Sequence, residues 1–193
     1  MDNQIQALFG SLINTIGTTI AAIGNTPLII KSEEASTSLE LVGGTLQATG
    51  GALVADSIKQ YSLGKLGIQL KVIGNLITII AIVATANEED RIKLEIQESL
   101  TEATGGGLSF VAALEEEPTP LSLYEIYGSF LETVGYSMVA LAGIKTLRGE
   151  DSETINTIGW WIEVIGSVIG FIGVAKGISN ESGQPEASWL ETD

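Results

Sequence analysis

The ionisable side chains that could do chemistry in this sequence lie inside otherwise apolar stretches. Glu132 and Glu163 are carboxylates in two such stretches, and Lys71 is an amine in a third. Two neighbouring carboxylates could act as a general acid and base or hold a cation, and a lysine beside one of them could form a buried ion pair. All three stand four residues after a glycine, where Asn14 and Gln47 stand in two further segments. We call these five positions the slot residues.

Three interpretations of the slot residues stay open. In the first, which the sequence favours, they are boundary positions from which long polar side chains reach solvent. In the second, Lys71 meets Glu132 or Glu163 between helices and fixes their register, as buried polar residues do in coiled coils. In the third, Glu132 and Glu163 form a catalytic or cation-binding pair.

Composition excludes most other chemistry. The 193 residues contain no Cys and no His, so a disulfide, a thiolate nucleophile, a zinc–sulfur site and a serine–histidine triad are all impossible. The three consecutive glycines Gly105–Gly107 are not followed by the Lys and the Ser or Thr that a phosphate-binding loop contains. A formal net charge of −15 opposes binding to nucleic acid. We therefore expect no enzyme activity, no catalytic residue, no cofactor, no bound metal and no nucleic-acid partner.

A seven-residue glycine repeat positions the slot residues. Its template is a glycine, an aliphatic residue three positions on, another six positions on, and a second glycine, as in Gly10–Ile13–Ile16–Gly17. Five segments follow it, and a sixth, over residues 100–114, is a degenerate copy aligned on Gly106 and Gly107. A period of seven filled in this way indicates helices.

Glycine inside a helix costs about 0.5–1 kcal/mol relative to alanine, so the repeat needs a compensating gain. We expect that gain from close approach of two backbones, with the flanking aliphatic side chains interdigitating around the contact. The predicted packing glycines are Gly10, Gly17, Gly24, Gly43, Gly50, Gly67, Gly74, Gly128, Gly135, Gly159, Gly166 and Gly173.

Capping residues and helix breakers divide the repeat into helices. Examples are Pro27 after the first glycine segment, and Ser32, followed by two glutamates, as an N-cap. Short connections favour antiparallel neighbours, so we predict an all-α fold, a six-helix antiparallel bundle of glycine-heptad hairpins in one domain over residues 1–178. The predicted helices span residues 3–24, 33–61, 65–86, 88–115, 121–148 and 152–177, and residues 179–193 are predicted to be a flexible polar tail.

The faces opposite the glycines carry few charges. The first helix has no charge between Asn3 and Ile30, and we place Thr15, Thr18 and Ala22 on its outer face. A helix without a charged face is a central helix, an assembly surface or a membrane span. Polar residues interrupt the apolar stretches, which argues against a span, and the N-terminus has no signal peptide pattern.

Segments such as residues 13–26, which read INTIGTTIAAIGNT, resemble the short repeats of uncharacterised repetitive helical proteins of Bacillus-type spore-forming bacteria. An Ile-x-Ala-Ile-Gly unit recurs in those proteins. The resemblance covers residues 5–178 in rhythm, and the first, third and sixth predicted helices in detail. It implies a bacterial origin and assigns no site residues.

We expect a non-enzymatic structural or protein-interaction bundle in the cytoplasm, which binds copies of itself or another protein through its weakly polar outer faces. One alternative is a membrane-associated or membrane-inserting helical protein, such as a toxin, immunity or pore component. A second alternative is a carrier that holds an apolar ligand between its helices.

Overall fold

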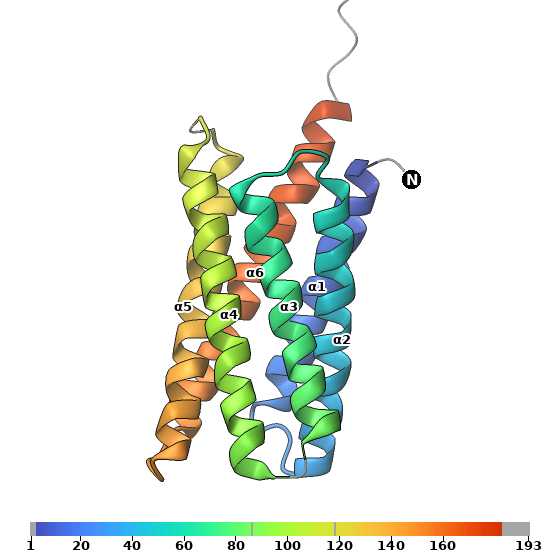
Figure 1. Ribbon diagram of the computed structural model, residues 1–193. Coiled ribbons are helices and arrows are strands. Elements are labelled where there is room, and N and C mark those ends of the chain that lie inside the picture. Colours follow the sequence, from blue (N-terminus) through green and yellow to red (C-terminus); the bar gives the residue numbers. More distant parts are fainter. Residues whose placement is uncertain (1–2, 86, 118, 183–193) are drawn as a thin grey trace, which may run out of the picture.

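The computed structural model describes residues 3–85, 87–117 and 119–182, and these residues form helices and no strand (Figure 1). The all-α fold class and the predicted number of helices are confirmed. The helices are α1 (Asn3–Gly24), α2 (Glu33–Ser57), α3 (Leu63–Ala84), α4 (Glu88–Glu115), α5 (Ser122–Leu147) and α6 (Glu153–Ser182).

Two helix ends differ from the prediction by more than two residues. The α2 helix ends at Ser57, four residues early, because Ile58 is extended and its carbonyl accepts a 2.7 Å hydrogen bond from the Lys65 amine instead of continuing the helix. The α6 helix continues past residue 177 to Ser182, so the first part of the predicted tail is helical. Residues 183–193 of that tail lie outside the described residues.

The helices form a closed ring (Figure 1). Each packs against the one before and the one after it in the chain, and α1 packs against α6. In the described part of the chain, no other pair of helices has its backbones in packing contact. The ring therefore has an interior surface to which every helix contributes. Its upper end, as drawn in Figure 1, holds the start of α1 and the end of α6, and its lower end holds the loops 25–32, 85–87 and 148–152.

The predicted packing glycines lie where the two helices of a hairpin approach each other, in the pairs α1–α2, α3–α4 and α5–α6. At each of these glycines, an added Cβ would lie within 3.0 Å of an atom of the partner helix. On Gly50, for example, it would lie 2.5 Å from the backbone nitrogen of Asn14 and from the carbonyl oxygen of Gly10. Only a residue without a side chain permits these backbone contacts.

The side chains are arranged in the opposite way to those of a water-soluble bundle. The largest side chains with under 2% of their surface exposed are Glu102, Glu163, Thr18 and Ser99. Large apolar side chains point outward on most of the helices. They include Ile5, Phe9, Leu12 and Ile16 on α1, Ile73, Leu76, Ile80 and Val83 on α3, and Ile158, Ile165, Val168 and Ile172 on α6.

This arrangement corrects the predicted outer face of the first helix. Thr15, Thr18 and Ala22 are buried, whereas Ile16, which was predicted to interdigitate beside the glycine contact, is 46% exposed. The reason is the close backbone approach at the glycines. It leaves space for small and hydroxyl side chains on the inner side of each hairpin, and the branched aliphatic side chains point away from it.

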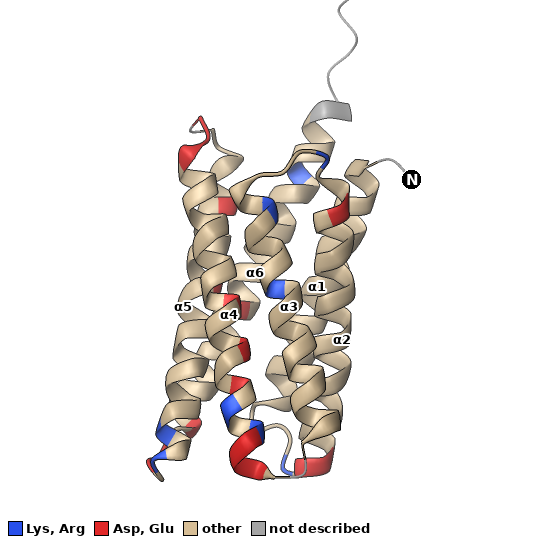
Figure 2. Ribbon diagram, viewed as in Figure 1, with Lys and Arg blue, Asp and Glu red and all other residues tan. Residues whose placement is uncertain are grey.

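Exposed charges gather at the two ends of the ring (Figure 2). Among the described residues, every exposed Asp, Glu, Lys or Arg lies in a loop or within about two turns of a helix end. Between these ends, the outer surface of the described part of the chain carries no exposed charge. The ring therefore has an uncharged outer band between two charged rims.

Replacing Gly50 with alanine tests the close packing, and Gly107 is its matched control because an added Cβ there meets no atom within 4 Å. We expect Gly50→Ala to lower the free energy of unfolding by about 1–3 kcal/mol through overpacking. Gly107→Ala should raise it by about 0.5–1 kcal/mol through helix propensity. Thermal unfolding followed by circular dichroism measures both changes. Equal shifts in the two variants would show that the contact does not require glycine.

Candidate functional site

The slot residues pack against the glycines of the neighbouring helix. In the α5–α6 hairpin, a Cβ on Gly135 would lie 2.5 Å from Cγ of Glu163, and one on Gly166 would lie 3.0 Å from Cγ of Glu132. The glycine therefore makes room for the stem of a polar side chain as well as for the opposite backbone. The same relation joins Gly17 to Gln47, Gly105 to Lys71 and Gly74 to Glu102. An added Cβ on Gly50 would instead meet the backbone of Asn14.

Glu102 is a sixth slot residue that the sequence analysis missed. The copy in α4 was aligned on Gly106 and Gly107, but the structure places Gly105 against Gly67 of α3. Glu102 precedes Gly105 by three residues, as Glu132 precedes Gly135. A polar residue three positions before a packing glycine is therefore the shared signal of all the helices, and it identifies Glu102 once α4 is aligned on Gly105.

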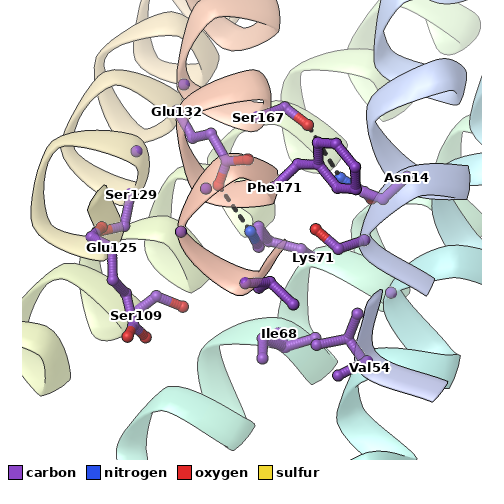
Figure 3. Close-up of a pocket in the computed structure, with 18 of the residues that line it drawn as sticks. Asn14, Val54, Ile68, Lys71, Ser109, Glu125, Ser129, Glu132, Ser167 and Phe171 are labelled. Atoms are coloured by element: carbon purple, nitrogen blue, oxygen red, sulfur yellow. Dashed lines mark hydrogen bonds and ion pairs between the residues drawn. The ribbon is translucent and has the colours of Figure 1, made fainter. Parts of the chain in front are cut away.

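Lys71 and Glu132 form an ion pair across the interior. The Lys71 Nζ lies 2.7 Å from Oε2 of Glu132, and the pair joins α3 to α5, two helices that do not pack against each other (Figure 3). The structure therefore brings Lys71 and Glu132 together between helices, as the second interpretation expects, and the further expectation that the pair fixes helix register stays a prediction. The interpretation as solvent-reaching boundary positions is wrong for Glu132, which is 7% exposed, and for Glu163, which is 0% exposed.

Other polar contacts line the same interior. The Asn75 amide donates a hydrogen bond to Glu102, and the Thr18 hydroxyl donates one of 3.1 Å to the side-chain oxygen of Gln47. The Asn14 amide donates a hydrogen bond of 3.4 Å to the Ser167 hydroxyl (Figure 3). These contacts form a column of polar groups inside the ring, which we call the polar column.

Glu163 is the exception in the polar column. It is fully buried, and neither of its carboxyl oxygens has a hydrogen-bond partner. It lies within electrostatic range of Glu98, Glu132 and Lys71. An unpaired carboxylate in such a place is strongly destabilising, since it has lost its hydration without gaining a donor.

Buried acids outnumber buried bases in the polar column. Glu98, Glu102, Glu132 and Glu163 are buried there, and the one amine among them, that of Lys71, pairs with Glu132. Glu98 and Glu102 are four residues apart on α4, and each carboxyl lies within electrostatic range of the other. In the described part of the chain, no three acidic side chains are grouped so that they could hold one metal ion.

Two cavities lie along the polar column. The upper cavity has a volume of about 460 Å³ and is lined by all the helices, down to Lys71 and Glu132 (Figure 3). The lower cavity has a volume of about 150 Å³, and its lining includes Glu40, Glu95 and Glu98 near the other end of the ring. Neither Glu102 nor Glu163 lines either cavity. The arrangement offers carboxyls that can bind protons at both cavities, and two further carboxyls, those of Glu102 and Glu163, that line neither.

Comparison with known proteins gives one match. The family described as "Family of unknown function (DUF6944)" matches residues 5–171, which is most of the chain. Searches of the curated proteins and of the solved structures each found no matching protein.

The contribution of the ion pair can be measured with Lys71→Met, which leaves Glu132 buried without its partner. We expect a loss of about 3–5 kcal/mol in the free energy of unfolding, because an uncompensated buried charge remains. The double variant Lys71→Met, Glu132→Met should lose less than the single variant, since both charges are removed. The control Lys93→Met, which breaks an exposed pair with Glu89, should leave the unfolding midpoint unchanged. A double variant less stable than the single one would contradict the pair.

Proposed function

The chain belongs to this family of unknown function, and we propose that it is a non-enzymatic integral membrane protein whose helices cross the bilayer as a ring around the polar column. The observation that carries the proposal is the position of the side chains: carboxyl, hydroxyl and amide groups lie inside, and large apolar side chains lie outside. Hydrocarbon stabilises that outer surface, whereas water does not.

Helix length supports the proposal. Three helices, α1, α3 and the Glu153–Asn180 part of α6, are long and apolar enough to cross a membrane. The α1 and α3 helices have 22 residues each, and at about 1.5 Å per residue such a helix matches a hydrocarbon core of about 30 Å. The α2, α4 and α5 helices have 25, 28 and 26 residues. Their charges lie at the helix ends or face the interior, so the ring can shield them from lipid.

The distribution of exposed apolar side chains favours lipid over a protein partner. They occur on α1, α3, α4, α5 and α6, for example Ile16, Ile80, Leu100, Phe130 and Ile165. A protein partner or a second copy covers one face of a bundle, whereas lipid surrounds it. The uncharged band between two charged rims also fits a hydrocarbon layer between two aqueous interfaces.

The other functions expected from the sequence are less well supported. A self-assembling bundle in the cytoplasm would need copies of the chain around most of its circumference to cover the same side chains. A carrier of an apolar ligand would hold it in the upper cavity, where Lys71, Glu132 and several serines would lose hydration against it. The bacterial origin implied by the resemblance to repetitive helical proteins remains part of the proposal, and the family match supports only membership in a family of unknown function.

Single cysteines introduced into this cysteine-free chain test the proposal. Ile165 is on the outer band and 53% exposed, and Glu150 is in an exposed loop at the lower rim. In membranes opened on both sides, a water-soluble maleimide should label Glu150→Cys quickly and Ile165→Cys slowly, because lipid covers Ile165. The protein should also stay in the membrane pellet after an alkaline carbonate wash. Recovery in the soluble fraction, with equal labelling of the two variants, would overturn the proposal.

A further inference from the structure

The polar column has properties that a membrane anchor does not need. We propose that it conducts protons across the bilayer, between the upper and lower cavities, by way of the carboxyls of Glu132, Glu163, Glu102 and Glu98. This inference rests on the proposed membrane location, because a proton pathway has a function only where it separates two compartments.

The order of the carboxyls follows from the cavities. Glu132 lines the upper cavity and Glu98 lines the lower one. On α6, Ser167 belongs to the upper lining and Trp160 to the lower lining, and Glu163 lies between them in the sequence and lines neither. Glu102 occupies the equivalent slot on α4 and also lines neither cavity. The acids are thus distributed along the axis of the ring. A site that chelates a metal ion would instead bring them to one point.

Glu163 is independent evidence that the polar column binds a proton. Its carboxyl is fully buried with no donor on either oxygen. The ionisable groups that face it come from three helices: Lys71 on α3, Glu98 and Glu102 on α4, and Glu132 and Tyr136 on α5. The neighbouring α1 helix contributes no ionisable side chain, because Asn3–Gly24 contains none. A carboxyl surrounded mainly by other acids avoids the cost of a buried charge by binding a proton.

Each complete passage along the polar column carries one proton, and with it one positive charge, across the bilayer. Water in one cavity gives a proton to the nearest carboxylate, which becomes a neutral acid. The O–H of that acid then gives its proton to the next carboxylate and returns to the ionised form. Glu163 has no hydrogen-bond partner, so its side chain must rotate toward each neighbouring carboxyl to take up the proton and to pass it on. Glu98 and Glu102 are four residues apart on α4, and both are buried. The last carboxyl releases its proton to water in the other cavity. The transmembrane proton gradient and voltage set the direction.

Two fully buried carboxyls on the pathway favour protons over larger cations. Glu102 and Glu163 have at most 1% of their surface exposed, and each lies in the sequence of its helix between residues of the upper and lower linings. A hydrated sodium or potassium ion would have to displace them, whereas a proton passes along their oxygens. Lys71 supports the pathway by compensating the charge of Glu132 whenever that carboxyl is ionised.

The test uses the full chain in liposomes of neutral phospholipid that enclose a pH-sensitive dye. A potassium gradient with valinomycin drives protons through the membrane. We expect the wild-type chain to change the internal pH faster than empty liposomes do, and Glu163→Gln to reduce the rate to that of empty liposomes. The matched control Glu117→Gln, which changes an exposed acid outside the polar column, should keep the wild-type rate. Flotation with the liposomes and resistance to carbonate show that each chain is inserted.

A second measurement covers the case in which Glu163→Gln fails to fold. An apolar carbodiimide, which adds to the O–H of a protonated acid, should modify the wild-type chain at Glu163 and abolish its proton flux. Mass spectrometry of the Glu163 peptide detects the adduct.

The outcomes separate the two proposals. An inserted wild-type chain with no proton flux above empty liposomes would overturn the proton pathway and leave the membrane proposal intact. Full flux after modification of Glu163 would also overturn the proton pathway. So would a potassium flux above that of empty liposomes, reported by a potassium-sensitive dye when valinomycin is left out. A chain that does not insert would overturn the membrane proposal, and the pathway with it.

Discussion

The backbone contact at the glycines is the constraint on which the structure depends. It brings the two helices of each hairpin so close that a methyl group in place of a hydrogen would collide with the opposite chain. Each glycine costs about 0.5–1 kcal/mol of helix stability, so the contact must supply a larger gain through packing. Once the backbones meet, the polar stems of Glu132 and Glu163 fit on the glycines of their partners, and the branched aliphatic side chains point outward.

A second level of order comes from the ion pair between Lys71 and Glu132. The glycine contacts act within hairpins, but this pair joins α3 to α5, two helices with no packing contact. It therefore sets how the hairpins are arranged around the interior. A buried ion pair is weak evidence for stability, because desolvation offsets most of its attraction, and its best-supported role is to specify one arrangement among several. In the arrangement seen here, the buried acids Glu98, Glu102 and Glu163 lie inside the ring together with this pair.

Much of the fold could be predicted from the sequence. The period of seven, the caps and the breakers predicted every helix in the described part of the chain. The contact between Lys71 and Glu132 belonged to one of three interpretations of the slot residues, and the sequence favoured another. Which side of each helix faces the interior of the ring, and which side faces outward, could not be predicted in the same way. An aliphatic residue beside a packing glycine, such as Ile16, fits a buried seam in water and an outer surface in lipid equally well. Glu102 was missed because adjacent glycines in α4 offer more than one alignment, and only contact with Gly67 selects Gly105.

The relation between slot and glycine occurs in each hairpin, so the ring consists of three similar units around one axis. Three identical chains could build the same ring, but then every unit would carry the same charges. Joined in one polypeptide, the units need not be identical: the first carries Asn14 and Gln47, the second Lys71 and Glu102, and the third Glu132 and Glu163. A repeated architecture in a single chain can thus hold a chemically asymmetric interior, with one cation facing several acids.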